Sequence, residues 1–170
     1  TDCDSLRWSA GKIRMQNAGN DKLARWDQPA NSLDGLNLMK HLADENGVAA
    51  IEALMRELCL GPGPETTGRE LGRIAWEHIS TGGKRLRARL AMSTVEALGG
   101  NTSDGVAWGA ACEFLHNASL IHDDIEDGDT FRRGKAALWT RYGIAQAINA
   151  GDLCIALGYA AIESVPGSSS

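Results

Sequence analysis

The sequence has few aromatic residues, prolines and cysteines, and no excess of positive charge. Aromatic residues make up 5% of its 170 residues, and 22 acidic residues outnumber 17 lysines and arginines, for a net charge of -5. A negative chain without a long basic run gives no reason to expect nucleic acid as a partner. Its four cysteines include no C-x-x-C pair. Their spacing argues against a zinc site and a disulfide framework, and favours a reducing compartment.

The sequence also lacks long hydrophobic runs. No apolar run approaches the ~18 residues that a membrane-spanning helix needs, and no secretory signal opens the chain. We therefore expect a cytoplasmic protein without a transmembrane segment. A hydrophobic content of 43% over this length is sufficient for one domain with a core.

Apolar residues recur at intervals of three and four after residue 33, which predicts helices. The longest predicted helices cover 104–127 and 136–165, with a polar loop at 128–135 between them. Because alternating strand patterns are nearly absent, the predicted fold class is all-α. We expect an irregular N-terminal extension at 1–33, a helical domain at 34–165 and a flexible tail at 166–170, which is rich in serine.

Two acidic residues near the end of the predicted helix 104–127 form the first candidate site. Asp123 and Asp127 are four residues apart and therefore share a helix face, and His116 lies about two turns earlier. Mg²⁺ takes one or two protein carboxylates and completes its shell with water and phosphate oxygens. The alternative is a buried histidine beside a solvated acidic helix end. Carboxylates at a helix C-terminus oppose the macrodipole unless a cation neutralises them, and this favours the metal site.

A calcium-binding EF-hand loop is a rival interpretation of the same acidic segment. Asp123, Asp127 and Gly128 match its first, fifth and sixth positions. Ile125 and Gly134 stand where oxygen ligands are required, so the EF-hand interpretation fails.

Basic residues cluster in two places. Arg132 and Arg133 follow the acidic segment closely, and forked guanidinium groups suit phosphate. Lys84 and Arg87 lie where a helix is expected to begin, and helix N-termini bind anions. The alternative is a basic helix start that is merely exposed to water. Because cations there oppose the helix dipole, we favour a bound anion.

Together these segments resemble the trans-isoprenyl diphosphate synthases, also called polyprenyl synthetases. The resemblance is carried by G-G-K-R-L-R at 82–87, L-H-N-A-S-L-I-H-D-D-I-E-D at 115–127, R-R-G-K at 132–135 and A-G-D at 150–152. The second of these contains the family's first D-D-x-x-D motif. The resemblance implies an antiparallel helical bundle of the isoprenoid synthase type. It covers about the first half of the family's pattern, because the second aspartate-rich motif has no counterpart in the sequence.

The resemblance also implies a reaction. A prenyltransferase of this family condenses isopentenyl diphosphate with an allylic diphosphate, with Mg²⁺ assisting ionisation, to make a longer trans-polyprenyl diphosphate. By the same resemblance Asp123 and Asp127 would ligate Mg²⁺, and Asp124 would support the metal cluster as a third catalytic acid. Arg132 would contact the allylic diphosphate. The expected binding residues for isopentenyl diphosphate are Lys84, Arg87, His116 and Arg133.

In the family, the positions four and five residues before the first aspartate line the pocket for the growing chain. Here they are Ser119 and Ala118, both small, which indicates products of C20 or longer. The resemblance further implies a homodimer or a complementing chain, and predicts an exposed apolar face where further helices would pack. An alternative function stays open: a non-catalytic or truncated subunit that binds diphosphate, or a partner synthase, without turnover alone.

Overall fold

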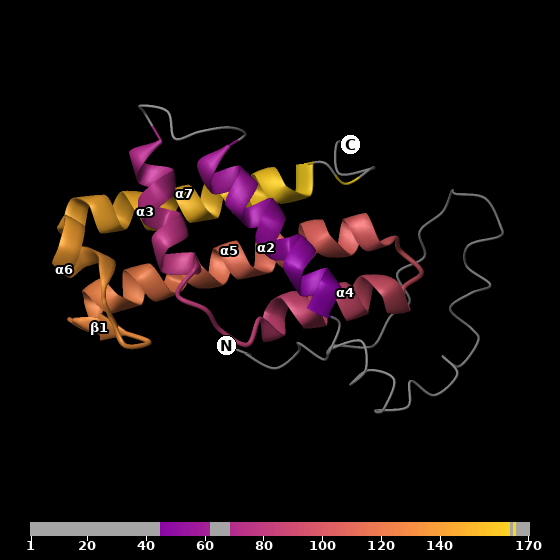
Figure 1. Ribbon diagram of the computed structural model, residues 1–170, viewed down its shortest axis with the longest axis horizontal. Coiled ribbons are helices and arrows are strands. Elements are labelled where there is room, and N and C mark those ends of the chain that lie inside the picture. The colour runs from indigo at the N-terminus through magenta and orange to yellow at the C-terminus, as the bar shows by residue number, and fades with distance from the viewer. Residues whose placement is uncertain (1–44, 62–68, 164, 166–170) are drawn as a thin grey trace, which may run out of the picture. The chain divides into compact units, whose positions relative to one another are not determined.

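The computed structural model describes residues 45–61, 69–163 and 165. Six helices and one short hairpin make up this part of the chain (Figure 1). In chain order they are α2 (Glu45–Leu60), α3 (Glu70–Ile79), α4 (Leu86–Ala97), α5 (Thr102–Glu126), β1 (Phe131–Arg132), β2 (Lys135–Ala136), α6 (Leu138–Tyr142) and α7 (Ile144–Glu163). The all-α prediction is confirmed.

Helix α5 is the centre of the bundle. It makes its most extensive contacts with α7 and α4, each of which runs antiparallel to it, and α2 also packs against it (Figure 1). Its start is capped by Asn101, whose side chain accepts a hydrogen bond of 3.1 Å from the Asp104 backbone N–H. The long helix predicted over 104–127 is therefore confirmed, with its ends at Thr102 and Glu126.

Small side chains line the contact between α5 and α7. The buried positions include Ala111 and Ala118 on α5, and Ala150 and Gly151 on α7. A side chain at Gly151 would collide with the imidazole of His122. Because α5 and α7 approach closely at these positions, the C-terminal end of α5 is held firmly against its neighbour.

The predicted helix over 136–165 is two helices, α6 and α7, and it begins two residues later than predicted. Ala136 belongs to a hairpin in which Phe131 pairs with Ala136 and Arg132 with Lys135. Arg133 and Gly134 connect the two strands with φ angles of 51° and 78°, which is typical of a tight hairpin turn. A second break occurs at Gly143, whose φ of 81° lies outside the right-handed helical region and separates α6 from α7.

Helix α7 is long and apolar enough to cross a membrane, judged by length and composition alone. This differs from the expectation that no apolar run approaches that length. The core helix of a soluble protein passes the same test, so this length and composition are weak evidence for a membrane span. In the bundle, α7 has its largest contact with α5.

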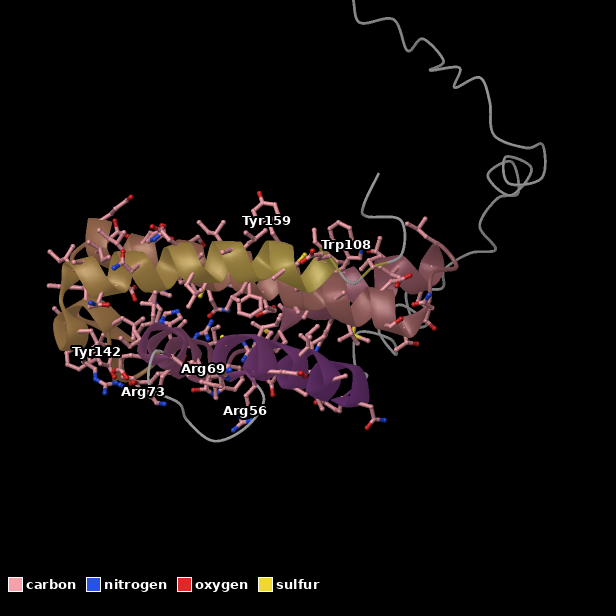
Figure 2. All side chains as sticks on the ribbon, turned by 90° about the horizontal axis from the view of Figure 1, so that it is seen from above. Arg56, Arg69, Arg73, Trp108, Tyr142 and Tyr159 are labelled. Atoms are coloured by element: carbon pink, nitrogen blue, oxygen red, sulfur yellow. The ribbon has the colours of Figure 1, made fainter. Side chains whose placement is uncertain are left out.

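Large apolar side chains are exposed on several helices. Figure 2 shows Trp108 and Tyr159 projecting on the side of the bundle opposite α2, and both are at least 45% exposed. The described residues all fall within one unit, 34–170. The predicted extension at 1–33 and the tail at 166–170 lie outside the described residues and stay predictions.

Candidate functional site

The last turn of α5 places its aspartates in two different environments. Asp123 and Asp127 are exposed, whereas Asp124 is 1% exposed. Adjacent helical residues point about 100° apart, so burial of Asp124 leaves its neighbours free to face solvent together. The two predicted metal ligands therefore share an open face, and the predicted third acid does not.

Asp124 is paired with Arg132 on the hairpin. The Arg132 Nε donates to Asp124 Oδ1 at 2.5 Å, and Nη2 contacts the same oxygen. Asp129 Oδ2 lies 3.5 Å from Nη2. The hydrogen bond to Asp124 raises the pKa of Arg132 above its usual value, although partial burial opposes the shift. Arg132 is thus fixed beside the acidic end of α5.

Arg133 connects the hairpin to the other basic segment. Its Nη1 donates to the Gly82 carbonyl, and a side chain at Gly83 would meet its guanidinium at 3.2 Å. Residues about fifty positions apart in the sequence therefore meet here. The two predicted basic clusters, 82–87 and 132–135, therefore form a basic region that meets at Gly82 and Arg133, and Arg132 lies beside the acidic end of α5.

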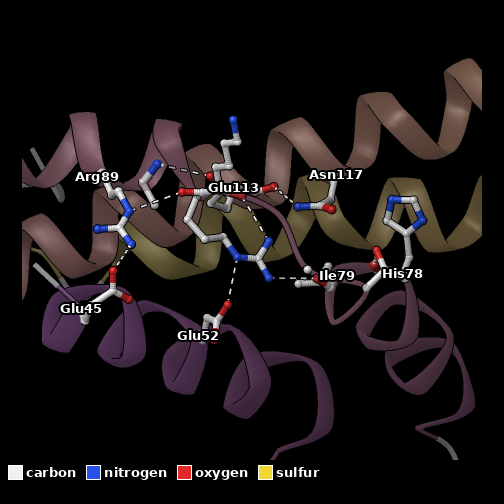
Figure 3. A network of polar contacts seen from close by, with 12 residues as sticks. Glu45, Glu52, His78, Ile79, Arg89, Glu113 and Asn117 are labelled. Carbon is white, nitrogen blue, oxygen red and sulfur yellow. Dashed lines mark hydrogen bonds and ion pairs between the residues drawn. The ribbon is translucent and has the colours of Figure 1, made fainter. Parts of the chain in front are cut away.

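Within the segment 82–87, Arg85 points in the direction opposite to its neighbours. Lys84 and Arg87 are exposed, while Arg85 is 5% exposed. Its guanidinium donates to Glu52 at 3.0 Å and to Glu113 at 3.3 Å, as well as to the Ile79 carbonyl at 2.9 Å (Figure 3). Arg85 has a φ of 49°, a left-handed conformation that costs a non-glycine residue about 1 kcal/mol. The buried contacts hold this conformation, and with it the outward direction of Lys84 and Arg87.

Sequence reasoning assigned no role to Arg85 or Glu113. A signal was present for Glu113, because it is the only Asp, Glu, Lys or Arg between Asp104 and Asp123. A lone charge in an apolar helix indicates a buried partner. For Arg85, the preceding glycine pair indicates a tight change of chain direction, although the inward orientation of the side chain follows only from the fold.

Two histidines lie close to the basic region. Burial first, and then the charge of Arg87, lowers the pKa of His116 below its usual value. His78 on α3 is 5% exposed, and burial followed by the charges of Arg133 and Arg132 lowers its pKa to about 4. Its Nε2 is buried without a hydrogen-bond partner. Burial and the neighbouring arginines therefore favour the neutral form of both imidazoles. His78 was not expected from the sequence.

A groove of about 720 Å³ runs between α4 and α5. Arg87, His116 and Ser119, three of the predicted site residues, contribute to its wall. The other lining residues are mostly apolar: Leu90, Ala91, Thr94, Val95, Trp108, Cys112 and Leu115. The groove thus combines a charged part with an apolar part.

The two residues predicted to control chain length do not share this groove. Ser119 is exposed and lines it, whereas Ala118 is 2% exposed and belongs to the hydrophobic core. The Ala118 methyl group therefore faces the packed interior. Their role in product length stays a prediction, and the geometry favours Ser119.

The donor set at the end of α5 fits Mg²⁺ in its chemistry. Within 45–61, 69–163 and 165, no group of three or more His, Cys, Asp or Glu side chains is arranged to hold a metal by itself. Mg²⁺ bound together with a diphosphate needs only one or two carboxylates, and Asp123 and Asp127 are exposed and could provide them. On α7, Asp152 lies 3.6 Å from His122 Nε2.

Comparison with known proteins identifies the family. The model of the family described as polyprenyl synthetase matches residues 69–169, more than half of the chain. The chain belongs to the polyprenyl synthetase family.

Individual relatives agree with this assignment. A short chain isoprenyl diphosphate synthase of Methanothermobacter thermautotrophicus is 38% identical over 76% of this chain and 36% of its own length. A geranylgeranyl diphosphate synthase of Methanosarcina mazei is 35% identical over 75% of this chain and 39% of its own. The chain therefore spans less than two fifths of the length of these relatives.

Solved structures show the same fold. The geranylgeranyl pyrophosphate synthetase of Pyrococcus horikoshii superposes with a TM-score of 0.65 at 32% identity, covering 76% of this chain and 38% of that one. The likeness confirms the isoprenoid synthase type of helical bundle.

Proposed function

We propose that this chain forms part of a trans-prenyltransferase that condenses isopentenyl diphosphate with an allylic diphosphate. The single observation that carries the proposal is the position of the hairpin, whose arginines contact both the acidic end of α5 and the segment 82–87. Asp123 and Asp127 face solvent there, with Arg132 fixed beside them and Arg133 in contact with Gly82. Family membership supports the same activity.

Each charged group has a role in this proposal. Asp123 and Asp127 would hold Mg²⁺, which when bound supplies positive charge to the allylic diphosphate. Arg132 would donate to the same diphosphate and stabilise the charge that develops on it as the allylic C–O bond breaks. Lys84, Arg87, His116 and Arg133 would hold the diphosphate of isopentenyl diphosphate, so that its double bond lies near the ionising carbon.

The apolar groove provides a surface for the remaining step, the formation of the new C–C bond. Once the C–O bond breaks, the double bond of isopentenyl diphosphate attacks the allylic carbon, a new C–C bond forms, and a proton leaves to the released diphosphate. Water would intercept the carbocation, so the reaction needs an apolar surface beside the charged site. Leu90, Leu115 and Trp108 provide one wall of that kind. We propose Ser119 as the wall residue that leaves the groove open for products of C20 or longer.

An alternative is a subunit that binds diphosphate, or a partner synthase, without turnover by itself. The exposed apolar side chains on α4, α5 and α7, among them Leu90, Leu115 and Tyr159, favour this alternative because they could pack against another chain. Homodimerisation would use the same kind of surface. We further propose that the protein acts in the cytoplasm.

One assay tests the proposal and separates the alternatives. The purified chain is incubated with Mg²⁺, farnesyl diphosphate and labelled isopentenyl diphosphate, alone and with a full-length polyprenyl synthetase whose own first aspartate motif is inactivated. Labelled product from the chain alone supports the prenyltransferase. Product only in the mixture supports the complementing subunit. No labelled product in the mixture, together with no diphosphate binding by the chain, would refute both. The matched control is the Asp123→Asn chain, which should lose the activity while it keeps the fold.

A further inference from the structure

Glu113 is a buried carboxylate in the middle of α5, away from the acidic end of that helix. It is 4% exposed, and both of its side-chain oxygens are engaged. Oε2 accepts from Arg85 Nη1 and Oε1 accepts from the Ala88 backbone N–H, each at 3.3 Å. The Glu113 backbone carbonyl accepts from Asn117 Nδ2 at 2.7 Å (Figure 3). The carboxylate therefore serves other parts of the protein and is not open to a ligand.

The contact with Ala88 places this carboxylate at the start of α4. Ala88 lies in the first turn of α4, where backbone N–H groups have no partner within the helix. Arg85, which precedes the helix, makes no capping hydrogen bond with its side chain. Glu113 supplies a negative charge there from a different helix, which the α4 dipole favours. A diphosphate at this helix start therefore depends chiefly on the side chains of Lys84 and Arg87.

The contact with Arg85 fixes the backbone between those two basic side chains. Three acceptors from three elements hold the Arg85 guanidinium: Glu113 on α5, Glu52 on α2 at 3.0 Å and the Ile79 carbonyl at the end of α3 at 2.9 Å. They keep Arg85 at a φ of 49°, in the left-handed region. Without these contacts a non-glycine residue favours a right-handed or extended backbone, and either would turn the basic residues on both sides of it.

A second arginine supports the same segment from within α4. Arg89 Nε donates to the Lys84 carbonyl at 3.3 Å, and Arg89 Nη2 pairs with Glu45 on α2 at 2.7 Å. Helix α2 thus holds the segment 82–87 at two points, through Glu45 and Glu52. Neither glutamate lines the groove between α4 and α5.

The residues proposed to hold isopentenyl diphosphate depend on the direction of this segment. Arg87 lines the groove together with His116, and after burial its charge is the next cause that lowers the pKa of that imidazole. Arg133 contacts the Gly82 carbonyl at the other end of the segment. A rotation of the backbone between 82 and 87 would therefore change the spacing of all the groups proposed to hold this diphosphate.

We propose that Glu113 is a positioning residue: through Arg85 it sets the direction of Lys84 and Arg87, and with it the affinity for isopentenyl diphosphate. Glu52 supports the same guanidinium from the half-exposed side. The proposal rests on the proposed function and deepens it, since it assigns to the basic diphosphate site a buried residue that touches no substrate. Binding that depends on Mg²⁺ at the end of α5 does not involve Glu113.

Calorimetric titration of the full 170-residue chain with two ligands tests this assignment. Isopentenyl diphosphate in EDTA reports on the basic site, and the Mg²⁺-dependent binding of a non-ionisable farnesyl diphosphate analogue reports on the acidic end of α5. Glu113→Gln keeps the size of the side chain but has one acceptor oxygen in place of two. It should weaken binding of isopentenyl diphosphate about tenfold and change binding of the analogue by less than about twofold.

Two further variants separate positioning from stability, each titrated at a temperature where circular dichroism shows it folded. Phe114→Leu removes core volume at the neighbouring, fully buried position and should bind both ligands as wild type does. Arg85→Gln should weaken binding of isopentenyl diphosphate at least as much as Glu113→Gln. Because Glu113 acts through Arg85, the double variant should show no further loss.

Three results would overturn the proposal. Glu113→Gln could bind isopentenyl diphosphate as tightly as wild type, it could weaken binding of both ligands equally, or Phe114→Leu could cause the same loss. In each of these the wild-type chain binds both ligands, so the proposed function survives. A wild-type chain that binds only the analogue would refute the basic site and this inference with it. Absence of binding of both ligands would refute the whole proposed function.

Glu52→Ala decides the case in which Glu113→Gln does not fold. The Glu52 side chain is 46% exposed, so its replacement leaves the core intact. The variant removes one of the three acceptors of the Arg85 guanidinium and should weaken binding of isopentenyl diphosphate about threefold, without effect on the analogue. Glu57→Ala, at an exposed site on the same helix, is the matched control and should change neither affinity. Equal affinities of Glu52→Ala and Glu57→Ala for isopentenyl diphosphate would overturn the proposal.

Discussion

The two faces of α5 carry similar residues that have different tasks. The core face holds Glu113 and Asp124, each nearly inaccessible and each paired with an arginine from another segment. The open face holds Asp123, Asp127 and Ser119, all exposed. On the core face a carboxylate fixes an arginine, and with it the segment that bears the arginine. On the open face the carboxylates are available to a ligand. Position around the helix, more than residue type, decides which role an acid has.

The largest effect is expected on the core face at Glu113. Glu113→Ala would leave the Arg85 guanidinium buried and only partly compensated, which costs about 3–5 kcal/mol of unfolding free energy. Urea denaturation followed by circular dichroism measures it. Glu57→Ala, at an exposed site on α2, is the matched control and should change stability by less than about 0.5 kcal/mol. Equal losses in the two variants would contradict the structural role of the Arg85–Glu113 pair.

The next effect concerns pH and the buried His78. Its pKa is about 4 in the folded chain and about 6.5 when unfolded, so the unfolded chain binds more protons at this site between these values. Stability should therefore fall as pH is lowered from 6.5 to 4, by up to about 3 kcal/mol from this residue. The charges that oppose protonation come from Arg132 and Arg133 on the hairpin and from His116 on α5.

Denaturation of wild type and His78→Gln over this pH range isolates the contribution. The variant should show a shallower loss of stability towards pH 4. The same loss in both proteins would mean that His78 is not buried as a neutral imidazole.

A smaller effect separates Ala118 from its neighbour Ser119. Ala118→Phe inserts a ring into the packed core and should cost about 1–3 kcal/mol of stability. Ser119→Phe places the ring in the groove, so stability should change little while the product becomes shorter. Denaturation curves and chromatography of the labelled products measure the two effects. An unchanged product distribution with Ser119→Phe would remove Ser119 from the chain-length pocket.

The sequence was sufficient to predict α5 and the shared face of its exposed aspartates. The 3.6-residue period is a local feature that can be recognised without knowledge of the fold, whereas the Asn101 cap, which starts the helix at Thr102, was not predicted. The strand at Lys135–Ala136 and the separation of α6 from α7 were missed, because 136–142 is largely apolar and resembles a helix start. Arg133 and Gly134, which have positive φ angles, form the hairpin turn before this stretch, and Gly143, also with a positive φ angle, ends α6.

The site was predicted in its residues but only partly in its arrangement. Arg132 pairs with Asp124, Arg133 contacts Gly82, and the charges of Arg87, Arg132 and Arg133 all act on His116. The sequence could not show that Asp124 is buried and Asp123 exposed. It also could not show that Ala118 is buried and Ser119 exposed. Both differences depend on which side of α5 is covered by the neighbouring helices. The roles of all these residues in binding and catalysis stay predictions.

A crystal structure of the chain with Mg²⁺ and a non-ionisable prenyl diphosphate analogue would test the central claim most directly. We expect the diphosphate between the exposed carboxylates of Asp123 and Asp127 and the Arg132 guanidinium, with Asp124 still paired to Arg132 and the prenyl chain directed along Ser119. Diphosphate bound elsewhere on the molecule, with the acidic end of α5 free of both metal and ligand, would contradict the account.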